Sequence, residues 1–301
     1  MSVGTLDTSR YIDGTADGRF QFARDLVSAL NKDGYAKLRN QGISYEDVRE
    51  IFSWVNCLDF NTTVGLTFRW GCSGRLIEHS PQRRFFNLSV EEKISCIHKG
   101  GTGPMSLQES LNIGPLRDTS YPNQWIAEKI LPAFREHVES YYTLSQETSN
   151  TIFEAIELGL NLPLYPYSLP HTDFGTLSLL FQDSAGGLEF EDRSKPGTFV
   201  PVTSEDTSDL IVTMADILQR WTNDVLKAGL HRVSVPRQFQ VDGGTEEDCI
   251  LPDRYSLVFF CRPSAEKSAG PIHDFVSEER PANYDEISAL EHLERRNRLV
   301  Y

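Results

Sequence analysis

Residues 170–192 read PHTDFGTLSLLFQDSAGGLEFED and predict a strand, a turn and a second strand. Residues 176–181 favour a strand, and the pair Gly186 and Gly187 is a strong turn signal. Side chains two residues apart on a strand point to the same side, so His171 and Asp173 converge on one point. An imidazole and a carboxylate are both metal ligands. Two such ligands do not hold a metal alone, so a third is needed.

The third ligand is expected further along the chain, in LKAGLHRVSVP at residues 226–236, which contains His231. Two imidazoles and one carboxylate on one face of a metal form the facial triad of non-haem Fe(II) oxygenases, which leaves open coordination positions. His171, Asp173 and His231 are therefore the candidate metal ligands. A lone His-x-Asp is more often a strand pair hydrogen-bonded to its neighbours than a ligand pair. The metal prediction thus depends on the features that follow in the sequence.

The segment DRYSLVFFC at residues 253–261 predicts a strand that is covered on both sides, because both of its faces are largely apolar. Arg254 and Ser256 share one of these faces. An Arg at the start of such a strand needs an anion. Its planar fork fits a carboxylate, to which the Ser256 hydroxyl adds a further hydrogen bond. The alternative is that Arg254 forms only a salt bridge at the end of the strand.

The chain resembles the 2-oxoglutarate/Fe(II)-dependent dioxygenase superfamily in five short segments that occur in the family's order. They are His171-Thr-Asp173, Gly186-Gly-Leu, Asp216-Ile-Leu-Gln-Arg-Trp-Thr-Asn, His231-Arg-Val and Arg254-Tyr-Ser256. Within the superfamily the chain is similar to the isopenicillin N synthase-like branch, which includes thymine hydroxylase-type and fungal secondary-metabolism enzymes. The resemblance implies a mainly β protein with flanking helices, whose core is a double-stranded β-helix of the jelly-roll type.

The resemblance also implies a function. Fe(II) would be held by His171, Asp173 and His231, and Arg254 with Ser256 would bind the distal carboxylate of 2-oxoglutarate. Dioxygen would convert this co-substrate to succinate and carbon dioxide while a small organic molecule of secondary metabolism is hydroxylated or desaturated. The protein supplies orientation and excludes water. The identity of the organic substrate is not readable, because residues facing it lie on loops and N-terminal helices.

Three alternatives remain open at the level of the sequence. The same ligand set can hold Zn(II) for hydrolysis, although a hydrolase has no need of a carboxylate anchor at Arg254 and Ser256. An Fe(II) oxidase that uses no 2-oxoglutarate would instead bind a substrate carboxylate at Arg254. The third alternative is a shortened, weakly active or inactive relative that acts as a binding protein.

The interval between Leu160 and His171 supports the third alternative, because the resembled family normally has an extra strand there. Only Leu164-Tyr-Pro-Tyr167 remains, which is too short for a returning strand and a turn. We therefore expect an exposed sheet edge, weak binding of 2-oxoglutarate, and oxidation of the co-substrate without product. A segment from residues 100–125 that fills the gap would remove this expectation.

Composition limits the classes of partner. The chain has 301 residues and a net charge of −14, which disfavours binding to nucleic acid or to an anionic membrane. Its hydrophobic content of 39% and aromatic content of 11% are typical of a globular enzyme. The five cysteines form no C-x-x-C and are expected to be reduced. No signal peptide and no membrane-spanning apolar run is visible, so a cytoplasmic location is predicted. The small-molecule substrate is implied by the resemblance to the dioxygenase superfamily.

Three regions are predicted along the chain. Residues 1–160 form a mostly helical region that packs on the barrel, residues 161–265 form the dioxygenase core, and residues 266–301 form a helical tail that packs back on the N-terminal part. A helix is expected over residues 19–32, where Phe22, Leu26 and Leu30 form one stripe. Surface or core positions without a role in the site are predicted for the remaining histidines, namely His79, His98, His137, His273 and His292.

Overall fold

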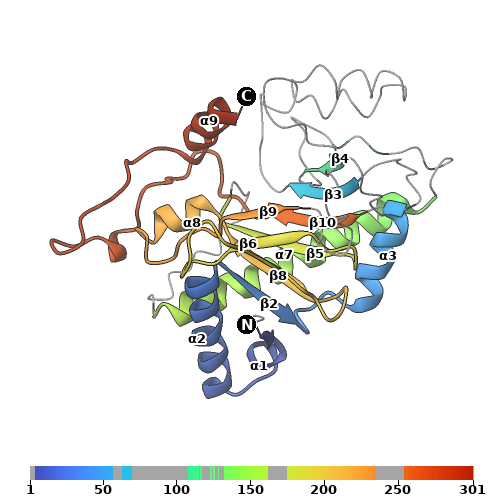
Figure 1. Cartoon of the computed structure of the whole chain (residues 1–301), viewed down its shortest axis with the longest axis horizontal. Coiled ribbons are helices and arrows are strands. Elements are labelled where there is room, and N and C mark those ends of the chain that lie inside the picture. Colours follow the sequence, from blue (N-terminus) through green and yellow to red (C-terminus); the bar gives the residue numbers. More distant parts are fainter. Residues whose placement is uncertain are drawn as a thin grey trace, which may run out of the picture.

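The structure is a computed structural model, shown in Figure 1. It describes residues 4–56, 63–69, 108–114, 132–161, 175–234 and 254–300, together with residues 116, 123, 125 and 128.

A mixed sheet of seven strands runs through the molecule in the order β1-β2-β8-β5-β10-β3-β4. Its central part, β2-β8-β5-β10, is antiparallel, whereas β1 pairs with β2, β3 with β10 and β4 with β3 in parallel. In sheet order the strands are β1 (Thr5–Asp7), β2 (Tyr35–Arg39), β8 (Leu210–Met214), β5 (Leu177–Gln182), β10 (Tyr255–Phe260), β3 (Thr63–Arg69) and β4 (Gln108–Ile113).

A second, antiparallel sheet lies against the first. It has the order β7-β6-β9, with β7 at Phe199–Pro201, β6 at Leu188–Glu191 and β9 at His231–Val233. One buried cluster joins residues of both sheets, which shows that they face each other across a packed interior. Its members are Tyr35, Leu188, Phe190, Val202 and Ile211, with Leu180 packed against it. This two-sheet core with flanking helices is the double-stranded β-helix that the sequence predicts.

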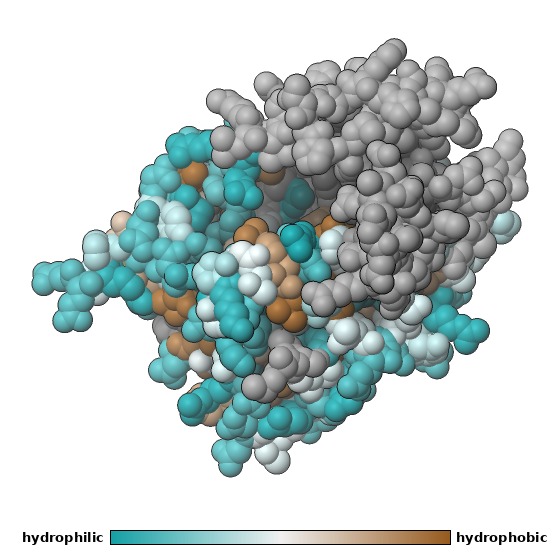
Figure 2. All heavy atoms as spheres, in the orientation of Figure 1, coloured by the Kyte–Doolittle hydropathy of each residue, from teal (hydrophilic) through white to brown (hydrophobic). Residues whose placement is uncertain are grey.

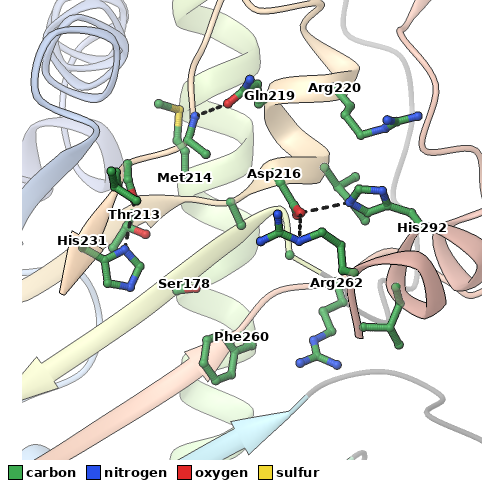
Figure 3. Close-up of a pocket in the computed structure, with 18 of the residues that line it drawn as sticks. Ser178, Thr213, Met214, Asp216, Gln219, Arg220, His231, Phe260, Arg262 and His292 are labelled. Carbon is green, nitrogen blue, oxygen red and sulfur yellow. Dashed lines mark hydrogen bonds and ion pairs between the residues drawn. The ribbon is translucent and has the colours of Figure 1, made fainter. Parts of the chain in front are cut away.

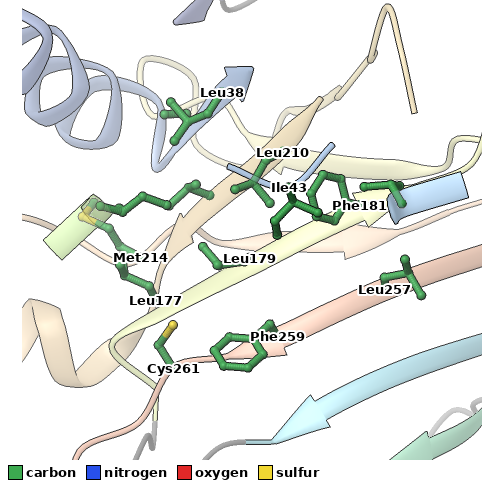
Figure 4. Close-up of a cluster of buried hydrophobic side chains, with 14 of the residues drawn as sticks. Leu38, Ile43, Leu177, Leu179, Phe181, Leu210, Met214, Leu257, Phe259 and Cys261 are labelled. Atoms are coloured by element: carbon green, nitrogen blue, oxygen red, sulfur yellow. The ribbon is translucent and has the colours of Figure 1, made fainter. Parts of the chain in front are cut away.

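Helices cover the other face of the large sheet. They are α2 (Ala16–Asp33), α3 (Tyr45–Asn56) and α7 (Phe134–Gly159), while the short α1 (Ser9–Ile12) packs on α2. The main hydrophobic cluster lies between these helices and the sheet, and it contains Leu179 from β5 and Phe259 from β10 (Figure 4). Side chains alternate along a strand, so the neighbours of these residues point to the inter-sheet side.

The pairing of β10 with β5 places the predicted anchor residues. Ser256 lies opposite Gln182, Val258 opposite Leu180 and Phe260 opposite Ser178. Leu180 belongs to the inter-sheet cluster, so this whole row faces the space between the two sheets. The shared face predicted for Arg254, Ser256, Val258 and Phe260 is thus confirmed at the strand positions, and the same alternation continues back to Arg254.

The sequence explains where α2 begins and ends. Thr15 accepts a hydrogen bond from the Gly18 amide at 3.2 Å and so caps the start of α2. Gly34 ends that helix with a φ of 79°, which glycine adopts without strain. Along the helix, Phe22, Leu26 and Leu30 are buried, as their spacing predicts. The predicted helix is therefore confirmed, with ends that reach slightly beyond residues 19–32.

Among the described residues, β10 has a neighbour on both sides, whereas residues 162–174, whose short length led to the expectation of an exposed edge, lie outside the described part. β3 pairs with β10 along the whole of Tyr255–Phe260, and β4 pairs with the far side of β3. The strand that covers the edge thus comes from residues 63–69, and residues 108–113 lie one strand further out. The sequence did not show this, because a pairing between segments so far apart leaves no local spacing signal. The large sheet therefore also includes strands from the first 160 residues.

The C-terminal helix α9 (Ala289–Val300) packs on α8 (Asp216–Trp221), and the prediction that the tail packs on the N-terminal part is wrong for the described residues. Its apolar stripe was predicted, but the surface that receives the stripe was not. A separate cluster of Ile217, Ala269, Ile287 and Ala289, with Trp221 and Leu293 beside it, joins the two helices. The 3-10 helix η3 (His273–Phe275) lies in the connection to α9. None of the described helices has the length and apolar character needed to cross a membrane.

Candidate metal and co-substrate site

His231 is the first residue of β9 and lies opposite Phe190 of β6, with their ring centroids 5.2 Å apart. Phe190 faces the inter-sheet space, and so does His231 because residues opposite each other in a ladder share a face. The Nδ1 atom of His231 is 3.0 Å from the Gly229 carbonyl oxygen. A carbonyl only accepts, so Nδ1 carries the proton. Nε2 is left as the ligand atom for a metal.

The backbone before His231 is held by a close contact with the end of α2. A Cβ on Gly229 would lie 2.6 Å from the Gly34 carbonyl oxygen and 2.8 Å from Phe190, so only glycine fits. Arg193 joins the same two segments through its guanidinium. It donates to the Leu30 carbonyl of α2 at 3.2 Å and to the Ala228 carbonyl at 3.1 Å.

Arg254 lies partly buried at the turn between β5 and β6, where its Nε donates to the Gly186 carbonyl at 2.7 Å. Burial lowers the pKa of this guanidinium, and the nearby Asp183 carboxylate opposes the shift. No carboxylate among the described residues lies within ion-pair distance of it. A desolvated guanidinium without a counter-charge in contact is suited to bind an anionic ligand.

Ser256 follows on the same face and is 5% exposed. Gln182, opposite it, donates from Nε2 to the Val202 carbonyl at 3.2 Å, while its buried Oε1 has no partner among the described residues. Buried polar atoms are nearly always paired, and an amide oxygen only accepts, so a donor such as water is expected to complete this network. The donors that fit a dicarboxylate co-substrate are the guanidinium of Arg254 and the hydroxyl of Ser256.

The structure brings three of the five predicted site residues to one inter-sheet space, namely His231, Arg254 and Ser256. His171 and Asp173 lie outside the described residues. In the part of the chain that the structure describes, no three His, Cys, Asp or Glu side chains are grouped so as to hold a metal. That part contains only one of the three predicted ligands.

A cavity of about 690 Å³ adjoins His231 (Figure 3). The sheets contribute Ser178, Thr213, Met214, His231 and Phe260 to its wall, and the rest of the wall comes from α8, from α9 and from connecting segments such as residues 228–230. On the face shown in Figure 2, hydrophobic residues reach the surface near the centre, beside hydrophilic residues on the left. Leu230, next to His231, is one apolar side chain that is well exposed, at 59%.

His292 of α9 lines this cavity, although the sequence assigned it no role in the site. Its Nε2 atom is 3.0 Å from the Asp216 carboxylate, and the Nε of Arg296 is 3.2 Å from the same oxygen. Burial raises the pKa of Asp216, but the hydrogen bond from His292 and the charges of His292 and Arg296 outweigh it and hold that pKa below its usual value. The missed signal was the i,i+4 spacing of His292 and Arg296, which places both on one helix face.

Comparison with known proteins decides the family. A model of the 2OG-Fe(II) oxygenase superfamily matches residues 164–263. A 2-oxoglutarate-dependent dioxygenase of Aspergillus rugulosus is 33% identical, over all of this chain and all of its own length. The chain is a member of the 2-oxoglutarate/Fe(II)-dependent dioxygenases.

Other relatives agree with this assignment. A protein of Petromyces alliaceus named proline hydroxylase is 32% identical over 98% of both chains. The structure of a full-length Neurospora crassa protein in complex with α-ketoglutarate has a TM-score of 0.70 at 20% identity, covering 99% of this chain and 96% of the other, and so it shares the fold. The protein is an oxidoreductase that uses Fe(II), 2-oxoglutarate and dioxygen to oxidise a small molecule. The relatives do not favour the zinc hydrolase, the 2-oxoglutarate-independent oxidase or the inactive binding protein.

The alignment with the Aspergillus rugulosus relative contains gaps in this chain. The alignment with the Aspergillus rugulosus protein runs over 341 residues, whereas the chain has 301. Some positions of that relative therefore have no counterpart here.

Proposed function

We propose that this dioxygenase binds Fe(II) through His171, Asp173 and His231 and holds the distal carboxylate of 2-oxoglutarate with Arg254 and Ser256. The observation that carries the proposal is the state of Arg254, a partly buried guanidinium without an ion pair among the described residues. The orientation of His231, whose Nε2 is left for a metal, supports it independently. His171 and Asp173, which their spacing predicts to share one side of a strand, are the remaining two ligands.

In this proposal the bound iron, 2-oxoglutarate and dioxygen supply the oxidising chemistry, and the side chains of the protein supply position. The Gly229 carbonyl keeps the proton of His231 on Nδ1. Arg254 and Ser256 fix the far end of the co-substrate. The apolar inter-sheet cluster lies beside them.

The finer function is hydroxylation or desaturation of a small molecule in secondary metabolism. The names of the fungal relatives, among them a proline hydroxylase, support this proposal. We further propose that the enzyme acts without nucleic acid or membrane partners, in line with its net charge of −14. A cytoplasmic location is also a proposal, and microscopy of the tagged full chain tests it.

The decisive experiment adds Fe(II) and then 2-oxoglutarate to the full chain without oxygen and records the visible charge-transfer band of the chelate. We expect the band in the wild type and its loss in His171→Ala, Asp173→Ala and His231→Ala, because each removes one of three protein ligands. His273→Ala is the matched control, since its imidazole lies in η3, away from the cavity. Near-normal turnover in His231→Ala would refute the ligand assignment.

A further inference from the structure

One row of the large sheet places two hydroxyls next to each other at the level of the cavity. Each residue of the row lies opposite the next, in the order Tyr35 of β2, Thr213 of β8, Ser178 of β5 and Phe260 of β10. Ser178 is two residues from Leu180, which packs against the inter-sheet cluster, so the row faces the space between the sheets. The hydroxyls of Ser178 and Thr213 are therefore neighbours on that face.

This hydroxyl pair, Ser178 and Thr213, lies near His231. All three residues line the cavity. The Gly229 amide donates to the carbonyl of Met214, the residue after Thr213, at 3.3 Å, and this bond joins the backbone before His231 to the end of β8. In Figure 3, Thr213 lies beside His231, and Ser178 is the next residue along the row. A group bound to the hydroxyl pair is thus held next to the proposed metal ligand.

Neither hydroxyl of the pair has a hydrogen-bond partner in the part of the chain that the structure describes. Thr213 is only 5% exposed, and Ser178 is half-buried. A hydroxyl has one donor and two acceptor sites, and buried polar groups are nearly always paired. The pair is therefore expected to bind a polar group that enters the cavity.

The spacing of the pair suits a carbonyl oxygen. The Cβ atoms of residues directly opposite each other in an antiparallel ladder are about 4.5–5.5 Å apart. Two hydroxyl oxygens that each donate over about 2.8 Å to the two lone pairs of one oxygen are about 4.8 Å apart. A carbonyl oxygen has two lone pairs, so it can accept from Ser178 and Thr213 at once.

The charged side chains in the described part of the wall already have partners. Asp216 pairs with His292 and Arg296, Arg220 pairs with Asp285, and the Arg262 guanidinium carbon lies 5.7 Å from the centre of the Phe260 ring. Burying a further charge beside these pairs would cost free energy, because no described group is left to compensate it. An uncharged ligand therefore suits the cavity better than an ion.

We propose that the prime substrate is an uncharged carbonyl compound, whose carbonyl oxygen accepts hydrogen bonds from Ser178 and Thr213. Its apolar part lies against Phe260 and Leu230, which also line the cavity. The inference rests on the proposed function, because it takes the His231 end of the cavity as the place of oxidation. The volume of about 690 Å³ suits a small organic molecule. Two hydrogen bonds to one oxygen fix the carbons beside it and so select which C–H bond is oxidised.

The test uses three probes of nearly equal shape. They are the ketone 1-phenylpropan-2-one, the alkene 2-methyl-3-phenylprop-1-ene, in which CH₂ replaces the oxygen, and phenylacetate, in which a charged oxygen replaces the methyl group. Each is titrated calorimetrically into the full chain with Fe(II) and saturating 2-oxoglutarate in the absence of oxygen. We expect the ketone to bind about tenfold more tightly than the alkene, the effect of two neutral hydrogen bonds, and more tightly than phenylacetate.

Variants assign this preference to the hydroxyl pair. Ser178→Ala and Thr213→Val should each reduce the ketone-to-alkene ratio, and the double variant should bring it to about one. Thr213→Ser keeps the hydroxyl and should keep the ratio. Thr176→Val is the matched control, because the buried Thr176 hydroxyl also has no partner among the described residues but does not line the cavity. The charge-transfer band of each variant shows that its metal site is intact.

Four results would overturn the inference. They are equal binding of ketone and alkene by the wild type, tighter binding of phenylacetate than of the ketone, failure of all three probes to bind, and survival of the preference in the double variant. A missing charge-transfer band in the wild type would instead count against the proposed metal and co-substrate site. The two proposals therefore fail in distinguishable ways.

Discussion

His231 is oriented by backbone groups that are themselves fixed by two glycines. The Gly229 carbonyl sets which imidazole nitrogen is protonated, and Gly229 fits only because neither it nor Gly34 has a side chain. Arg193 reinforces the contact by donating to carbonyls on both segments. A substitution at Gly229 is therefore expected to act on His231, the proposed metal ligand.

We predict that Gly229→Ala weakens Fe(II) binding by about tenfold or more, the usual cost of disturbing a group that orients a ligand. Overpacking should also lower stability by about 1–3 kcal/mol, because the new Cβ meets the Gly34 carbonyl at 2.6 Å. Metal titration and thermal unfolding measure the two effects. Gly4→Ala is the control, since its Cβ would have no atom within 4 Å. Unchanged iron affinity in a destabilised Gly229→Ala protein would show that the contact is only structural.

The second prediction at this scale concerns Arg254. Arg254→Lys keeps the charge but loses the planar fork, so the apparent affinity for 2-oxoglutarate should fall about tenfold, or roughly 1.4 kcal/mol. Iron binding should change little. Arg232→Lys serves as the comparison, because its exposed ion pair with Glu189 lies on the surface and contributes little. A loss of iron with unchanged co-substrate affinity would contradict the assignment.

At the residue scale, the sequence predicted which side chains share a face of a strand, because this depends only on the alternation of neighbouring residues. It placed Arg254 and Ser256 on one face of β10 because that pattern is local. It missed His292 and Arg296, since their role depends on which surface α9 contacts. Asp216 was part of a recognised segment, but its pairing with α9 was not predicted.

Among the elements, α8 and α9 are joined by ion pairs as well as by apolar packing. Asp285 lies before α9 and accepts hydrogen bonds from Arg220 at 2.9 Å and from Arg295 at 2.6 Å. These bonds, that of Arg220 first, lower the pKa of Asp285 to about 2. The folded pKa is thus below the unfolded value of about 3.9. The stabilisation is present above the unfolded pKa and is lost as pH falls through the folded one.

We therefore expect Asp285→Asn to lower the Tm by an amount that stays constant between about pH 5 and about pH 7. The difference from wild type should shrink as pH falls from about 4 towards 2, because Asp285 then becomes protonated in both states. Thermal unfolding followed across this range measures it. Glu278→Gln, at an exposed position in the same connection, should show no such difference. A difference that grew towards low pH would have the wrong sign.

The elements themselves were largely predictable. The capping residues and apolar stripes of α2 and α3 are local signals, and Ser44 and Asp47 form the reciprocal cap at the start of α3. The sequence did not predict which helix or strand each element packs against or pairs with. α9 packs on α8, and β3 pairs with β10, through contacts between segments distant in sequence.

At the scale of the whole molecule, the alignment of the chain with its Aspergillus rugulosus relative leaves gaps in this chain. β3 covers the edge of β10. In the resembled family the extra strand before the first metal ligand also carries a polar side chain that helps to hold 2-oxoglutarate, and the short interval between Leu160 and His171 remains a reason to expect weak co-substrate binding. We predict a weak affinity for 2-oxoglutarate and its conversion to succinate in the absence of a prime substrate. A succinate assay of the iron-loaded enzyme tests this. Tight binding without any background succinate would contradict it.

The place of β10 in the large sheet has a consequence for the order of folding. This strand lies between β5 and β3, yet it leaves the ribosome after every other strand that the structure describes. Until residues 255–260 are synthesised, β5 and β3 each lack a neighbour. The large sheet is then divided into two parts, β1-β2-β8-β5 and β3-β4. Contacts of such long sequence separation make folding slow and expose strand edges meanwhile. A fragment that ends at residue 250 should therefore aggregate, whereas the full chain should refold as a single cooperative unit.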